Sequence, residues 1–448
     1  MLRAGAEYIY DQPNFFTGQR VNQNPPFATS LGQASAGYIP FSNPYAVPTA
    51  LQNSSTILSN PFPSAASFSG KPTGANATFL NGGQFIVLPK QFHPAATMQW
   101  TASIQQAFAH GWQFQMDYIG SKSSHDELGT PIDPVIYIPG NWSGPGSCVA
   151  TGIGAIAGTG TGACSTVSNQ ASRSLLTLEN PSQGPLYGFA NSSAASVLVG
   201  DEGMANYNGL ITSVNHRLSS SFSLLANWTW SKCLDIEDNQ GDVSSITVEN
   251  PSNPALDYGP CGFDYRNIEN VVVVAKSTYG FSNRIVKEVL DNWEIAPNLR
   301  VTSGAPFSVT VGIDDSLTDI GNDRASLIPG VPVYQKVAFR SQAAATEQYR
   351  EYLNPAAFSL TNPNGTYGGT GKNQFRGTPS LQCDAQVSRY FPIHDNLSMD
   401  LRLEAFNALN HPNFGNPTTA RSSGTFGEVS STTGNGARVF QGAIKFIF

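Results

Sequence analysis

The sequence predicts an all-β chain built as one antiparallel, up-and-down meander of about ten long strands. Three observations predict this fold: apolar and polar residues alternate along successive segments, short turns join alternate pairs of segments, and long connections join the others. The composition agrees. Gly 43 and Pro 30 supply many turn residues, and only 12% of the 448 residues are charged, about half the usual share.

The same composition excludes several other classes of protein. Low charge and an aromatic content of 11% argue against a disordered chain. The longest aliphatic run, Val271–Ala275, is far shorter than the roughly 18 apolar residues of a membrane-spanning helix. A net charge of -7 does not favour binding to nucleic acid. Residues 1–10 resemble a strand rather than an export signal, so we expect a chain that is either cytosolic or lacks its front.

The second and third segments show the alternation clearly. In the second segment, the apolar face consists of Met98, Trp100, Ala102 and Ile104. The polar face consists of Gln99, Thr101, Ser103 and Gln105. After the turn at His110-Gly111, the apolar face of the third segment consists of Trp112, Phe114, Met116 and Tyr118. Its polar face consists of Gln113, Gln115 and Asp117. Two alternating segments joined by a tight turn predict a β-hairpin.

The other segments repeat this unit. We predict the remaining strands at 2–10, 206–218, 222–233, 267–279, 292–311, 381–391, 397–409 and 438–448. Five long loops then separate each odd strand from the next even strand: 11–95, 122–205, 234–265, 312–380 and 410–437. Because the strands run up and down, all five loops emerge at one end and the short turns at the other. This asymmetry, with strands of about 9–11 residues, is typical of outer-membrane barrels.

Alternation alone also fits a soluble β-sandwich, whose apolar face packs on a second sheet. In a membrane barrel, that face meets lipid and the polar face lines a wet lumen. Long loops are uncommon in compact soluble domains, so we favour a partial transmembrane β-barrel. Five of the six tryptophans would then anchor the apolar face or its interfaces: Trp100, Trp112, Trp228, Trp230 and Trp293.

The five cysteines predict disulfides rather than a metal site. No two form a CxxC pair and the chain has six His, which argues against zinc. Cys148 and Cys164 share one long loop, while Cys233 and Cys261 flank another where its two ends should be close. We therefore expect these two pairs to be bonded, which implies an oxidising compartment. Cys383 falls inside a predicted strand.

No pattern in the sequence predicts catalysis or a bound cofactor. The nucleophile, metalloprotease and phosphate-loop motifs GxSxG, HExxH and GxxxxGK[ST] are absent, and Gly368–Lys372 is interpreted as a loop. Two acidic clusters are interpreted as solvated loop charge: Asp235, Glu237 and Asp238, and Asp314, Asp315, Asp319 and Asp323. The second cluster is not a calcium loop of the EF-hand type, because no Glu closes it. Asp257 and Asp264, near Arg266, are expected to form rim salt bridges.

Four segments resemble one known family. They are 401–417 (LRLEAFNALNHPNFGNP), 303–309 (SGAPFSV), 354–358 (NPAAF) and 19–27 (QRVNQNPPF). Together they resemble Oar-like TonB-dependent outer-membrane transporters, most specifically in the 401–417 segment. The last strand is also similar to the signal by which outer-membrane barrels are recognised for assembly, with alternating Phe440, Gly442, Ile444, Phe446 and Phe448.

The resemblance implies a 22-stranded barrel with an N-terminal plug that contacts TonB. Ten strands are about half of such a barrel, and no plug or export signal is evident in residues 1–448. We therefore interpret the chain as the C-terminal barrel portion of a larger transporter, or as the product of a truncated gene.

The resulting expectation is an outer-membrane protein without enzymatic activity. Its long loops would capture an unidentified ligand that passes through a polar lumen. Its partners would be outer-membrane lipid, the barrel-assembly machinery and that ligand, with TonB only if a plug precedes this chain. The alternatives are a secreted β-rich module that binds glycan or protein and, less favoured, a glycoside hydrolase built on paired carboxylates.

Overall fold

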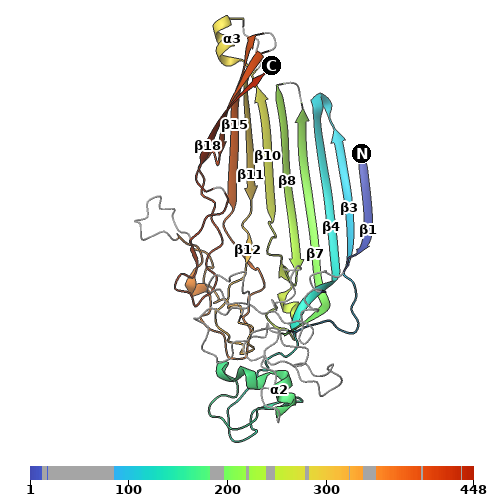
Figure 1. The fold of residues 1–448 in the computed structure, drawn as a ribbon, viewed down its shortest axis with the longest axis vertical. Coiled ribbons are helices and arrows are strands. Elements are labelled where there is room, and N and C mark those ends of the chain that lie inside the picture. The colour runs from blue at the N-terminus through green and yellow to red at the C-terminus, as the bar shows by residue number, and fades with distance from the viewer. Residues whose placement is uncertain are drawn as a thin grey trace, which may run out of the picture.

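The computed structural model describes residues 1–12, 18, 85–181, 196–217, 221–238, 248–277, 282–321, 323–335, 350–394, 397–434 and 436–448. Ten strands follow one another in chain order across a single antiparallel sheet (Figure 1). They are β1 (Leu2–Tyr10), β3 (Ala96–Ala107), β4 (Trp112–Pro131), β7 (Ser196–Arg217), β8 (Phe222–Asp235), β10 (Asn267–Lys276), β11 (Trp293–Thr302), β15 (Ser380–His394), β16 (Leu397–Phe406) and β18 (Val439–Ile447). The predicted ten-strand meander is confirmed.

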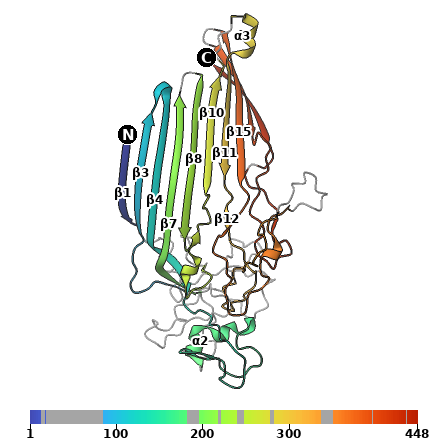
Figure 2. The same ribbon diagram turned by 180° about the vertical axis from the view of Figure 1, so that it is seen from behind.

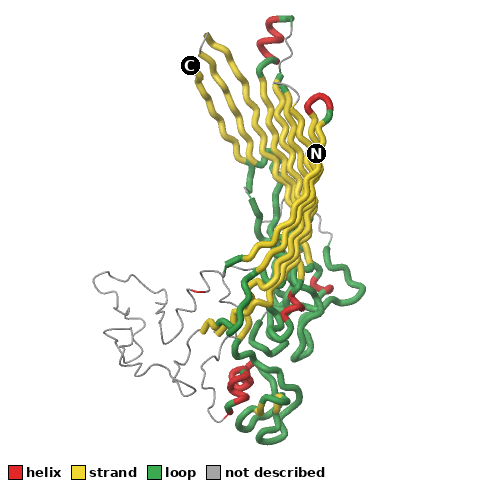
Figure 3. The backbone as a smooth tube through the Cα atoms, turned by 90° about the vertical axis from the view of Figure 1, so that its right-hand side faces the viewer, coloured by secondary structure: helices red, strands yellow, loops and turns green. Residues whose placement is uncertain are grey.

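The sheet is one curved layer that is not closed into a barrel. Seen from the side, it curves without a second sheet behind it (Figure 3). Among the described strands, β1 pairs only with β3 and β18 pairs only with β16. The described parts of the short connections lie at one end of the sheet, and those of the long connections lie at the other, as the views from both sides show (Figures 1 and 2). None of the described helices is long and apolar enough to cross a membrane.

The strand register places the apolar residues of neighbouring strands on the same face. Trp230 lies opposite Leu210, and Leu403 lies opposite both Val387 and Gly442. This face is not buried by other parts of the described chain, since Ile295, Leu403 and Ile444 are 51%, 52% and 61% exposed. The clusters of buried apolar residues lie instead among the long connections and the loop ends of the strands. The arrangement is that of a lipid-facing sheet rather than half of a sandwich.

Aromatic residues gather near both edges of this apolar face. Toward the short turns, the Arg389 guanidinium lies 5.3 Å from the centre of the Trp293 ring and 4.6 Å from that of Phe391. Toward the loops lie Trp228 and Trp230 of β8. At about 3.3 Å per residue, the stretch from Phe222 to Trp230 spans roughly 26 Å before tilt, close to the apolar band of an outer-membrane barrel.

Several strand boundaries differ from those predicted. The loop expected over 122–205 is shorter, because β4 continues to Pro131 and β7 already begins at Ser196. These extensions stay in the sheet because Leu128, Val197 and Val199 pack with Ile86 in a buried cluster. Ile86 belongs to β2 (Phe85–Val87), which pairs with β7 in parallel.

The strand predicted over 292–311 also ends early, at Thr302. Beyond Thr302, Gly304 packs directly against the Gly377 backbone, where a Cβ atom would lie 1.8 Å from the carbonyl oxygen. The chain then forms β12 (Pro306–Phe307), which pairs with β14 (Phe375–Arg376). The strand predicted over 397–409 ends at Phe406, because Asn407 adopts a positive φ of 50°.

The expected strand over 267–279 ends at Lys276, and the connection that follows contains the short helix α3 (Arg284–Leu290). The Asn283 side chain caps this helix by accepting hydrogen bonds from the backbone N–H groups of Ile285 and Val286. The other described helices and short strands also lie in connections between the long strands. The helices are η2 (Ala109–Gly111), η3 (Val167–Arg173), α2 (Leu175–Glu179), η5 (Pro254–Asp257) and η6 (Pro355–Ala357). The short strands are β5 (Val149–Ala150), β6 (Gly154–Ala155), β9 (Gly259–Pro260), β13 (Arg350–Glu351) and β17 (Glu428–Val429).

Two neighbouring valines in β10 test which face meets lipid. Val271 lies opposite Leu299 on the apolar face, while Val272 lies opposite Asn298 on the polar face. We expect Val271→Arg to lower the free energy of unfolding in lipid bilayers by about 2–4 kcal/mol, the cost of Arg on the lipid face near the midplane. Val272→Arg serves as the matched control and should cost far less. Denaturant titration of both variants in vesicles measures the difference, and equal losses would contradict the assignment.

Candidate functional site in the loop layer

The described residues of the five long connections pack into a folded layer at one end of the sheet, which we call the loop layer (Figure 1). Its largest apolar cluster joins residues far apart in the sequence: Phe307, Val309, Val311, Ala325, Leu353, Ala357, Phe358, Phe375 and Phe426. A second cluster surrounds the disulfide between Cys148 and Cys164 and includes Ile138, Ile156 and Leu178. The loop layer therefore has cores of its own, which a chain of solvated loops would lack.

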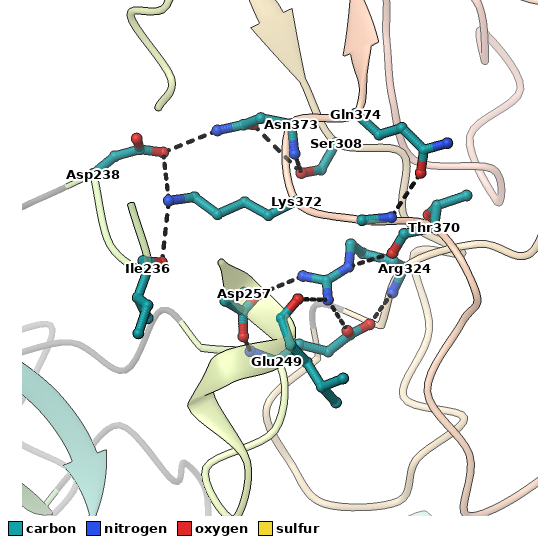
Figure 4. A network of polar contacts seen from close by, with 12 residues as sticks. Ile236, Asp238, Glu249, Asp257, Ser308, Arg324, Thr370, Lys372, Asn373 and Gln374 are labelled. Carbon is teal, nitrogen blue, oxygen red and sulfur yellow. Dashed lines mark hydrogen bonds and ion pairs between the residues drawn. The ribbon is translucent and has the colours of Figure 1, made fainter. Parts of the chain in front are cut away.

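A buried arginine connects two of the long connections. Arg324 forms ion pairs with Glu249, at 2.5 Å, and with Asp257, and its Nε donates to the Thr370 carbonyl at 2.8 Å (Figure 4). The backbone N–H of Arg324 also donates to Glu249 Oε1 at 2.6 Å. All three charged side chains are at least 93% buried. Burial of a charge is costly unless it is paired and hydrogen-bonded, so these contacts hold the connections in one arrangement.

The buried carboxylates outnumber the arginine beside them. Burial raises the pKa of Glu249 to about 7, and the negative charges of Asp257 and Asp323 add to this, although Arg324 acts in the opposite direction. Burial likewise raises the pKa of Asp323, against the hydrogen bonds that it receives from Ser316. Protonation of one carboxylate near neutral pH would relieve the excess negative charge in this part of the loop layer.

A lysine forms a second link between the same connections. Lys372 Nζ lies 2.6 Å from Asp235 and 3.4 Å from Asp238, and it donates to the Ile236 carbonyl at 3.0 Å. The neighbouring Asn373 also donates to Asp238, at 3.0 Å (Figure 4). Gly259 lets the backbone of Lys372 come close, because a Cβ atom on Gly259 would lie 2.5 Å from the Lys372 carbonyl oxygen.

A third link lies where β8 and β10 leave the sheet. Asp264 pairs with Arg266 at 3.0 Å and with Arg376 from the next long connection. The same carboxylate accepts a hydrogen bond of 2.8 Å from the backbone N–H of Cys233, and Cys233 is disulfide-bonded to Cys261. A disulfide and two arginines thus stabilise the base of one connection.

Arg173 fixes the outermost part of the loop layer, residues 132–181. This fully buried side chain donates to the carbonyls of Ile136, Thr166 and Leu317, at 2.6, 3.0 and 3.0 Å. Burial lowers the pKa of Arg173 to about 10, against the effect of Asp314 and Asp319. Gln170 adds a hydrogen bond of 2.5 Å to Asp314. Both residues tie this segment to the connection between β11 and β15.

A cavity of about 480 Å³ lies between the sheet and the loop layer. Strands β11 and β15 contribute Arg300, Thr302, Ser380, Gln382 and Asp384, all on the polar face. The loop layer contributes Tyr265, Ser303, Ala305, Thr378, Asn413, Phe414, Gly415, Asn416, Thr433 and Gly434. A volume of this size fits a small-molecule ligand, and its walls offer both hydrogen-bond donors and acceptors beside two aromatic rings.

The structure corrects the interpretation of both acidic clusters as solvated charge. Asp235, Glu237, Asp315 and Asp323 are all buried. Lys372 from another connection pairs with Asp235, whereas Asp315 and Asp323 accept hydrogen bonds from the backbone N–H groups of Asn362 and Ser316 in their own connection. Asp314 accepts hydrogen bonds from the backbone N–H groups of Thr318 and Asp319, at 3.1 and 2.9 Å. Asp264 pairs with Arg266 as expected, whereas Asp257 pairs with Arg324.

The residues that sequence analysis missed are the basic partners: Arg173, Arg324, Lys372 and Arg376. A signal for them was present, since the chain has only 24 Lys and Arg and buried carboxylates require such partners. Of the expected site residues, the structure joins Cys148 to Cys164 and Cys233 to Cys261, with Cα–Cα distances of 5.5 and 5.4 Å. Phe440, Gly442, Ile444 and Phe446 share the apolar face of β18. The 19–27 motif and most of the 11–95 loop lie outside the described residues.

Comparison with known proteins identifies the sheet. Residues 1–441 match the family model described as "Outer membrane beta barrel domain". Among solved structures, the outer membrane transporter YddB from Escherichia coli aligns with 82% of this chain and 34% of its own, at 7% identity and a TM-score of 0.38. The ferripyoverdine receptor of Pseudomonas aeruginosa aligns with 80% of this chain and 28% of its own, at 9% identity and a TM-score of 0.34. The ferric citrate transporter FecA aligns with 79% of this chain and 32% of its own, at 10% identity and a TM-score of 0.34. The chain thus spans about a third of their lengths. No curated protein matches it.

The Arg324 ion pairs should be essential to the loop layer. We expect Arg324→Met to destabilise this layer by about 3–5 kcal/mol, because it leaves two buried carboxylates unpaired. Hydrogen exchange should increase around Glu249 and Asp257 while the central strands stay protected. Arg402→Met is the control, since Arg402 pairs with Asp400 in the sheet with a 40% exposed side chain. Equal protection in wild type and Arg324→Met would contradict this prediction.

The two cysteine pairs should be oxidised in protein isolated from membranes. Mass spectrometry of peptides from the non-reduced protein should show Cys148 linked to Cys164 and Cys233 linked to Cys261, with only Cys383 alkylated. The Cys233→Ser/Cys261→Ser variant should lose about 3.5 kcal/mol in the loop layer, as expected for a closed loop of this length. Alkylation of all five cysteines without reductant would rule out both bonds.

Proposed function

The chain belongs to the outer membrane beta barrel domain family, and from this premise we propose that it is the C-terminal barrel portion of a TonB-dependent transporter. Its place is the outer membrane, where the exposed apolar face of the sheet meets lipid. The resemblance to Oar-like transporters fits this family. In this proposal the loop layer captures a ligand, the polar face of the sheet guides its passage, and the chain performs no catalysis.

The cavity between the polar face and the loop layer is the observation that carries this proposal. A captured ligand must pass from the loop end toward the polar face, and the cavity is lined by both. Arg300 can donate to a ligand, Asp384 can accept, and Asn413 and Asn416 can do either. This supports a small polar ligand with several hydrogen-bonding groups, such as an oligosaccharide or a short peptide.

The proposed partners follow from the same architecture. Outer-membrane lipid would cover the apolar face. The barrel-assembly machinery would recognise the last strand, where Phe440, Ile444 and Phe446 are exposed on one face. TonB would act only on a protein in which a plug precedes these strands. A secreted glycan- or protein-binding module, the alternative, would leave the exposed apolar face without a partner.

Two measurements test the proposal. First, the expressed chain should remain with outer membranes after extraction at alkaline pH, whereas a secreted module would be released. Second, purified protein should bind members of a library of oligosaccharides and short peptides, measured by thermal shift. We expect Arg300→Ala and Asn413→Ala to weaken the binding of such compounds about tenfold or more.

Arg402→Ala is the control for ligand binding, because Arg402 lies on the polar face of β16 but does not line the cavity. Binding that is unaffected by Arg300→Ala and Asn413→Ala would exclude the cavity as the ligand site. Release of the chain from membranes would overturn the transporter assignment itself.

A further inference from the structure

A cluster of metal-binding side chains lies at the loop end of the sheet, apart from the cavity and from the buried ion pairs. His93 precedes β3, His125 belongs to β4 and Asp201 belongs to β7. One potential ligand atom from each residue lies within 4.8 Å of the other two. Residues 93, 125 and 201 form no short motif, so their spacing in the sequence does not predict this meeting.

The distances within the cluster are close to those of a metal centre. His93 Nδ1 lies 2.6 Å from Asp201 Oδ2, and His125 Nδ1 lies 3.8 Å from the same oxygen. Ligands about 2.0–2.1 Å from a tetrahedral ion are roughly 3.3–3.5 Å apart. Small rotations of the two histidine side chains, which are 64% and 46% exposed, would equalise the distances without moving the strands.

The backbone at His125 holds this side chain next to Asp201. The pairing of β4 with β7 shifts register between Ser124 and Asp126 and again between Asp126 and Leu128, so that His125 bulges from the ladder. His125 also has a positive φ of 61°, which is uncommon for a residue other than glycine. Bulges commonly redirect a side chain near a functional site. A second contact fixes the segment before β3, because the backbone N–H of His93 donates to Asp201 Oδ2 at 2.8 Å.

We propose that His93, His125 and Asp201 form a binding site for a divalent transition-metal ion of the zinc type. Two imidazole nitrogens and one carboxylate oxygen favour such an ion over Ca²⁺ or Mg²⁺, which bind oxygen ligands. Three protein ligands leave one coordination position for water or for a donor atom of another molecule. The ion would link the segment before β3 to the extended hairpin of β4 and β7. This site does not depend on the proposed capture of a ligand in the cavity.

The second group of potential ligands in the described residues does not form a comparable site. Asp235, Asp238 and Cys261 also lie within 4.8 Å of one another. However, Cys261 is bonded to Cys233, and Lys372 already pairs with both carboxylates.

Metal binding to the chain of residues 1–448 in detergent micelles tests the proposal. Titration with Zn²⁺ against a chromophoric chelator should show one ion bound per chain. His93→Gln, His125→Ala and Asp201→Asn should each weaken this binding at least about tenfold. Co²⁺ should give the strong visible absorption of a tetrahedral site in the wild type, and this absorption should be lost in the variants.

His394→Ala is the matched control, because it removes a histidine at the opposite end of the sheet and should leave the zinc affinity unchanged. His93→Gln guards against misfolding, since the His93 side chain is exposed and its backbone contact with Asp201 is retained. Less than one equivalent of Zn²⁺ bound at saturation would overturn the proposal. So would unchanged affinity in His93→Gln and Asp201→Asn.

Discussion

The register of the antiparallel ladder is the constraint on which the rest of this structure depends. Side chains alternate with a period of two, so a shift of one residue would turn every apolar side chain of a strand toward the polar face. Ten strands keep this register, and Trp230, Leu403 and Val271 therefore lie on a common face. In hydrocarbon, each backbone N–H and C=O must also be paired within the protein. The ladder meets both demands between neighbouring strands.

The loop layer is stabilised by different means. Its connections form only short strands in the described residues, yet they enclose apolar clusters, disulfides and buried ion pairs. Arg324, Lys372 and Arg376 each come from the connection between β11 and β15, and each pairs with a carboxylate of the connection between β8 and β10. Two connections that begin on different strands thus become one body. A rigid loop layer loses less conformational entropy when it binds a ligand than flexible loops would.

The three features at the loop end have separate physical bases. The cavity is formed where the polar face meets the loop layer, the ion pairs hold that layer together, and the His93 cluster lies where β4 and β7 extend beyond the lipid-facing band. Extension of these two strands brings Asp201 and His125 beside the segment that precedes β3. The loop end thereby gains potential binding groups without any change to the alternation within the band.

The fold class was predictable from sequence, because alternation is a local property that segments such as 98–105 and 112–118 display within a few residues. The end of the sheet at which each connection lies followed from the alternation of short and long connections along the sequence. The buried state of Asp235 and Asp323 was not predictable, since it depends on Lys372 and on Ser316 in its folded position. The close packing of Gly304 on Gly377 beyond the end of β11 was likewise not predictable, because these two residues are distant in sequence. Period and turn length reside in the sequence itself, whereas burial and pairing of charges in the loop layer arise only when separate connections meet in space.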